Sequence, residues 1–83
     1  MPNVKIFDDR YDPPRLEVHQ GDRVAWSNNG GTVHSARADD GSFDTGRIDP
    51  GKTAEEVIKQ PPGSTIWYHD FHVEFRGEIV VVK

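Results

Sequence analysis

The sequence of 83 residues contains no cysteine, and its only methionine is Met1. A disulfide cannot form without cysteine, so no covalent cross-link stabilises the fold. Long hydrophobic runs are also missing: no apolar stretch approaches the roughly 20 residues of a membrane-spanning helix. Residues Met1-Pro2 do not begin a signal-peptide pattern. We therefore expect no membrane insertion, while these absences leave the compartment open.

Positive charge is scarce as well. Ten lysines and arginines face 14 aspartates and glutamates, which gives a net charge of -4. The basic residues are scattered along the chain and never form a run. A nucleic-acid-binding protein needs a concentrated basic patch to contact phosphates, so this pattern argues against nucleic acid as a partner.

The chain is too short for two separate hydrophobic cores, and we predict one domain over residues 1–83. A domain of this size buries little apolar surface, and it has no disulfide to compensate. A bound metal ion would be a natural source of additional stability.

The local pattern favours strands and offers no convincing helix. Short β-prone segments are separated by turn residues rich in glycine, proline, asparagine and aspartate. We predict about seven strands, at residues 4–7, 16–19, 23–26, 33–36, 54–59, 65–69 and 78–82. The second and third segments are separated by Gln20-Gly21-Asp22, which predicts a hairpin. Together these features indicate an all-β protein, a small β-sandwich.

Alternation in the segment 65–69 places Thr65, Trp67 and His69 on one face of a strand, and Ile66 and Tyr68 on the other. We interpret Trp67 as a core residue, which would turn His69 inward at the open end of the sandwich.

Two histidines, His69 and His72, lie three residues apart where this strand runs into a loop. A loop can fold back and direct both imidazoles at one metal ion. His34, which follows the glycine-rich loop 28–31, could complete such a site. The alternative is that all three are ordinary polar residues.

Several stretches in this order and spacing resemble the small cupredoxins, the plastocyanin and amicyanin type of blue copper protein. The resemblance extends from Val4 to Val82 and implies a Greek-key β-sandwich with copper held at one end between two loops. It also implies electron transfer with a redox protein partner and a periplasmic or otherwise exported location. The matching stretches are 14–26, Asn28, His34-Ser35, 40–46, Pro50-Gly51, Pro62-Gly63 and 77–81.

The ligand positions of that family fall on specific residues of this chain. The first histidine ligand falls on His34. The family's C-terminal loop reads Cys-x-x-His-x-x-Met, and without a gap it places His69 at the cysteine, His72 at the second histidine and Phe75 at the axial methionine. A register with a gap would instead give the cysteine position to Asp70. We favour the ungapped register because it keeps Gly77 and the other matching residues in place.

A blue copper centre requires a cysteine thiolate, so this chain cannot hold one. The predicted ligands are His34, His69 and His72, a set that suits copper of the non-blue, type 2 kind, with zinc as the alternative.

The surroundings of these ligands can also be predicted. Candidate fourth ligands are Asp70 and Glu74, with Asp44 more distant, and Phe75 would shield the axial side. By resemblance, Asn28 would tie the ligand loops together by hydrogen bonds and so orient the ligands.

These features predict a metal-binding protein that acts in electron transfer or copper handling. Two other functions stay open. An exchangeable metal position could make the protein a small metalloenzyme, although the sequence shows no clear acid–base pair beyond Asp70 and Glu74. The chain could also be a metal-free binding module.

Overall fold

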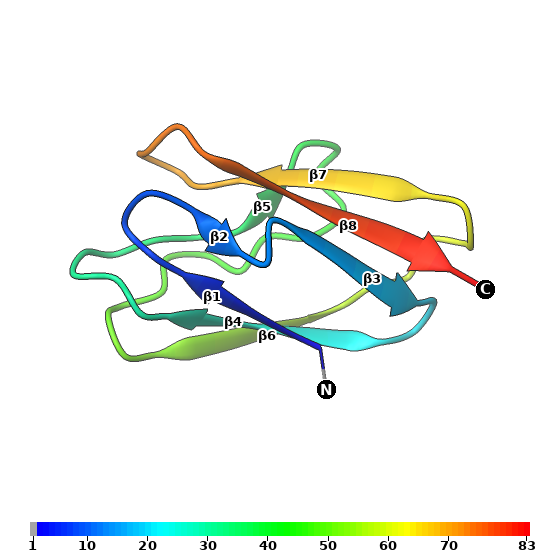
Figure 1. Ribbon diagram of the computed structural model, residues 1–83, viewed down its shortest axis with the longest axis horizontal. Coiled ribbons are helices and arrows are strands. Elements are labelled where there is room, and N and C mark those ends of the chain that lie inside the picture. Colours follow the sequence, from blue (N-terminus) through cyan, green and yellow to red (C-terminus); the bar gives the residue numbers. More distant parts are fainter. Residues whose placement is uncertain (1) are drawn as a thin grey trace.

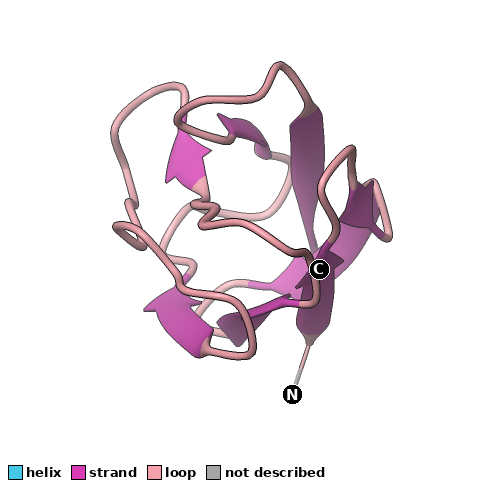
Figure 2. Ribbon diagram, turned by 90° about the vertical axis from the view of Figure 1, so that its left-hand side faces the viewer, coloured by secondary structure: helices cyan, strands magenta, loops and turns pink. Residues whose placement is uncertain are grey.

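A computed structural model describes residues 2–83 and contains two packed sheets (Figures 1 and 2). One sheet has the order β2-β1-β4-β6 and the other β3-β8-β7-β5. The all-β sandwich expected from the sequence is therefore confirmed. Its strands are β1 (Asn3–Ile6), β2 (Tyr11–Asp12), β3 (Arg15–His19), β4 (Arg23–Asn28), β5 (Arg37–Ala38), β6 (Thr53–Val57), β7 (Thr65–His69) and β8 (Arg76–Val82).

The predicted hairpin between residues 16–19 and 23–26 is wrong. Strand β3 pairs in parallel with β8, whereas β4 lies in the other sheet, parallel to β1 and antiparallel to β6. The intervening turn carries the chain from one sheet to the other, and Gly21 N–H donates to the Ile58 carbonyl at 2.7 Å. This crossing lets Val18 and Trp26 face each other's sheet and share one core.

The alternation in β7 is present, but its buried face is opposite to the prediction. Ile66 and Tyr68 are buried, whereas Trp67 is 44% exposed. Tyr68 packs between the aromatic rings of Tyr11 and Trp26, with ring centroids 4.5 and 5.5 Å away. These contacts give Tyr68 the better core position, and Trp67 lies outside beneath the Arg76 guanidinium.

The predicted strand at 33–36 is reduced to a single bridge between His34 and Ile48, and the regular strand β5 begins only at Arg37. The predicted strand at 54–59 is present as β6, which covers Thr53–Val57 and pairs with β4.

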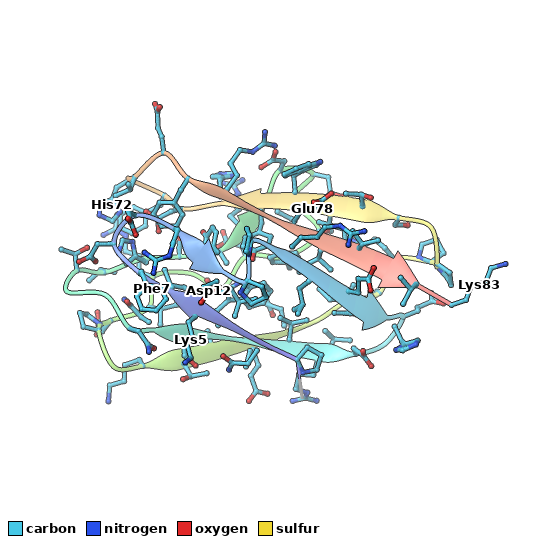
Figure 3. All side chains as sticks on the ribbon, in the orientation of Figure 1. Lys5, Phe7, Asp12, His72, Glu78 and Lys83 are labelled. Atoms are coloured by element: carbon cyan, nitrogen blue, oxygen red, sulfur yellow. The ribbon has the colours of Figure 1, made fainter. Side chains whose placement is uncertain are left out.

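The connections β1–β2, β4–β5 and β7–β8 gather at the end of the molecule opposite the C-terminus (Figure 1). Figure 2 shows this end with its loops in front of the strands. Phe7 and His72, from two of these loops, both lie toward it (Figure 3). Residues 2–83 include no helix that is long and apolar enough to cross a membrane.

Candidate metal centre

His34 is fully buried and its backbone is fixed on both sides. Its N–H donates to the Ile48 carbonyl at 3.1 Å, and its carbonyl accepts from the Ile48 N–H at 2.7 Å. The imidazole lies between two carboxylates. Nε2 is 2.8 Å from Asp8 Oδ1, and Nδ1 is 3.2 Å from Asp70 Oδ1. Because Asp8 contacts Nε2, Nδ1 is the nitrogen of His34 that faces Asp70.

Asp70 is a buried carboxylate surrounded by donors. Oδ1 accepts the Ser35 N–H at 2.7 Å, and Oδ2 accepts the N–H groups of His72 and Val73 at 3.2 and 3.0 Å. Burial raises the pKa of Asp70, but these hydrogen bonds and the one from His34 outweigh burial and leave the pKa below its usual value. The group is therefore an anion at neutral pH.

His72 completes the cluster from the β7–β8 loop. Its Nδ1 is 2.9 Å from Asp70 Oδ2, and its ring centroid is 5.3 Å from that of His34. The His72 side chain is 38% exposed, whereas those of His34 and Asp70 are fully buried. Of the three, only His72 reaches the surface.

The donor atoms of His34, Asp70 and His72 all lie within 4.8 Å of one another. Nitrogen and oxygen ligands at 2.0–2.2 Å from one ion lie roughly 2.9–4.2 Å apart, depending on geometry. The two distances from histidine Nδ1 to the Asp70 carboxylate, 3.2 and 2.9 Å, fall in this range. Two imidazoles and a carboxylate form a donor set that suits Cu(II) or Zn(II). The donor types and these two separations therefore fit a copper ion without a thiolate.

Asp8 orients His34, a role that the sequence motifs did not predict. The Asp8 carboxylate is itself held by the Gly31 N–H, at 2.9 and 3.0 Å from its two oxygens. The hydrogen bond from His34, followed by that from Gly31, lowers the pKa of Asp8. A carboxylate on the outer nitrogen fixes the tautomer of a metal-binding histidine. No local signal reveals this role, because Asp8 and His34 are 26 positions apart.

His69 lies outside this cluster in the structure. Its Nδ1 is 2.6 Å from Asp39 Oδ1, and its side chain is 40% exposed. Asp39 also pairs with Arg76, and the hydrogen bond from His69 is the main cause that lowers the pKa of Asp39. The set of three histidines stays a prediction, and the geometry brings Asp70 to His34 and His72 in place of His69.

The remaining predicted residues take varied positions. Glu74 is exposed, and neither Glu74 nor Asp44 belongs to the cluster formed within residues 2–83. The Phe75 ring packs edge-on to His34 at a centroid distance of 5.7 Å, so it does cover one side of the site.

Asn28 fixes the His34 loop, because its amide donates to the carbonyls of Thr32 and Ile48 at 2.8 and 2.7 Å. Within residues 2–83, Asn28 itself makes no hydrogen bond to the other ligand loop, whose bonds come from His34 and Ser35. The Ser35 N–H binds Asp70, and the Phe71 N–H donates to Ser35 Oγ at 3.1 Å. The link between the two ligand loops had one signal in the sequence, because His34-Ser35 is among the motifs that match the family. That match did not assign a function to Ser35.

Comparison with known proteins agrees with the β-sandwich fold described above. Solved structures similar to this chain include a purple cupredoxin from Nitrosopumilus maritimus, with a TM-score of 0.84 and 21% identity, covering 98% of this chain and 99% of that one. An amicyanin variant described with Cu(I) has a TM-score of 0.82 at 24% identity, and a reduced amicyanin variant has 0.82 at 26%. Both alignments cover 96% of this chain and 80% of amicyanin. Among curated proteins, none matches this chain.

A model of the cupredoxin-like domain family matches residues 2–81, nearly the whole chain. The chain therefore belongs to the cupredoxin-like domain family, as its sequence motifs predicted.

Proposed function

We propose that this protein binds one copper ion through His34 Nδ1, His72 Nδ1 and the Asp70 carboxylate, as a non-blue, type 2 site. The observation that carries the proposal is the buried Asp70 carboxylate, which lies between two imidazole Nδ1 atoms at 3.2 and 2.9 Å. The same atoms can share protons when no metal is bound, because these distances are also those of hydrogen bonds. An anion buried beside two neutral ligands supplies the charge that a thiolate would otherwise bring.

Bound copper would supply one-electron redox chemistry or a transport cargo, so the proposed roles are electron transfer and copper handling. The residues themselves favour slow electron transfer. Nitrogen and oxygen ligands let Cu(II) and Cu(I) adopt different geometries, and each redox step then requires rearrangement. Of the three proposed ligands only His72 reaches the surface, so we expect its ring to face a redox protein partner. An exported or periplasmic location belongs to the same proposal.

Copper titration of the metal-free protein, followed by absorption and electron paramagnetic resonance, tests this function. We expect one equivalent of Cu(II) to bind, with weak visible absorption and the spectrum of a type 2 centre. An intense band near the red end of the visible would contradict the non-blue assignment. No copper uptake at micromolar concentration would overturn the function, and competition with zinc in the same titration decides between the two metals.

Variants show whether Asp70 or His69 is the third ligand. Asp70→Asn should lower copper affinity at least about tenfold, because a charged ligand is lost, whereas His69→Ala should leave it nearly unchanged. His72→Ala, at a partly exposed position, gives a second test if Asp70→Asn does not fold. Circular dichroism reports on folding in each case. Equal losses in His69→Ala and His72→Ala would favour the set of three histidines.

A further inference from the structure

A concavity lies beside the metal centre, between β5, the connection from β5 to β6 and the loop after β7. It has a volume of about 360 Å³. This volume lies within the range of roughly 300–1,000 Å³ that is typical of small-molecule sites. Among the residues that line it are Ser35, Arg37, Asp44, Arg47, His69 and Phe71.

Two arginines give this pocket its charge. Within residues 2–83, neither the Arg37 nor the Arg47 guanidinium donates a hydrogen bond to another protein group. The nearest carboxylate to Arg37 is that of Asp44, with Nε and Oδ2 3.9 Å apart, beyond hydrogen-bonding distance. Asp44 Oδ1 already accepts the Gly46 N–H at 2.9 Å. The pocket thus carries an excess of positive charge on a protein whose net charge is -4.

Three side chains that line the pocket can contact a bound ligand. The Arg47 guanidinium stacks over the Phe71 ring at 4.7 Å, which limits the positions it can adopt. Ser35 Oγ accepts the Phe71 N–H, and its hydroxyl proton remains available to donate. His69 uses Nδ1 in its contact with Asp39, so Nε2 remains for a further partner.

We propose that this pocket binds a small oxyanion with two or more negative charges, held by Arg37 and Arg47 with Ser35 as an additional donor. Arginine forks match the paired oxygens of phosphate and carboxylate groups. Arg37 and Arg47 are exposed to solvent, and within residues 2–83 their guanidinium groups donate no hydrogen bond to protein that a ligand would have to displace. This binding does not depend on copper. Its test uses metal-free protein, so its failure and the failure of the copper site are separate results.

The experiment is a titration of ¹⁵N-labelled, metal-free protein with inorganic phosphate, and in a second arm with malonate, at constant ionic strength maintained with chloride. We expect saturable shifts confined to the backbone amides of Ser35, Arg37, Gly46, Arg47 and Phe71. The phosphate and malonate arms show which class of oxyanion binds more tightly.

The variant Arg37→Gln/Arg47→Gln should weaken binding at least about tenfold, because each charged hydrogen bond contributes substantially to affinity. Arg15→Gln is the matched control, since Arg15 is an exposed arginine on β3, away from the pocket, and should leave binding unchanged. Shifts that do not saturate, that spread over the surface, or that Arg15→Gln reduces as much would overturn the proposal.

Discussion

At the scale of single residues, Asp70 is the side chain that holds the candidate metal centre together. Its side chain is buried, accepts three backbone N–H groups and lies against two imidazoles. A carboxylate brings both a negative charge and four acceptor positions to a place with many donors. An imidazole offers at most one acceptor nitrogen and could not satisfy these donors in the same way. In the structure His69 instead contacts Asp39 at the surface.

Asp8 provides a prediction at this scale. Asp8→Asn replaces a charged acceptor on His34 Nε2 with a neutral one and weakens control of the tautomer. We expect copper affinity to fall about 10- to 100-fold, the usual effect of removing such an outer partner. Competition with a copper chelator measures the affinity. Nitrogen chemical shifts of the His34 ring in metal-free protein report the tautomer independently.

The control for Asp8 is its neighbour in sequence. Asp9 is exposed and, among the residues that the structure describes, pairs only with Arg10, at 2.8 Å, so Asp9→Asn should change neither measurement. An unaltered tautomer and an unaltered affinity in Asp8→Asn would show that Asp8 does not orient the ligand.

At the scale of elements, the pairing of β7 with β8 determines what faces the site. Tyr68 lies opposite Gly77 in the register of these strands. A Cβ atom at Gly77 would collide with the Tyr68 ring, which is buried and packed against Tyr11 and Trp26. Glycine at this position thus makes room for the ring, and the ring in turn directs Trp67 and His69 to the other face of β7.

Gly77→Ala should therefore destabilise the fold by about 1–3 kcal/mol, the usual cost of overpacking a filled core. Urea unfolding followed by fluorescence measures this loss. Gly31→Ala is the matched control, because a Cβ there meets Asp8 only at ordinary contact distance, 3.4 Å. A change in Gly77→Ala no larger than in Gly31→Ala would contradict this account of the strand pair.

At the scale of the whole molecule, acid should destabilise the protein. The pKa values of Asp8, Asp39, Asp40 and Asp70 are all lowered from 3.8 in the folded state, mainly by hydrogen bonds to their carboxylates. The unfolded chain therefore binds more protons than the folded one as the pH falls. The stabilisation from these groups is fully present above their unfolded pKa and is lost as the pH falls through their folded values.

We expect the free energy of unfolding of metal-free protein to decline below about pH 4, measured by urea titration at a series of pH values. Within residues 2–83, Asp40 accepts hydrogen bonds only from its own turn, so Asp40→Asn isolates one contributor away from the metal centre. This variant should show a shallower decline. Stability that stays constant or rises between pH 5 and pH 2 would contradict the prediction.

The sequence alone was sufficient to predict the β-sandwich and two of the candidate ligands. Period-2 alternation and turn residues locate strands without knowledge of their partners, and ordered motifs identified the family and the positions of His34 and His72. The missing cysteine excluded a blue centre outright. These conclusions hold because they depend on residue types and on spacing along the chain.

Only the tertiary structure decided which strands pair, which face of β7 is buried and which side chain joins the two histidines. Alternation defines two faces but does not say which one meets the core, and here the packing of Tyr68 decides. Asp8 and Asp70 reach His34 from 26 and 36 positions away. Contacts between such distant residues follow from how the sheets and loops pack, and no local pattern encodes them.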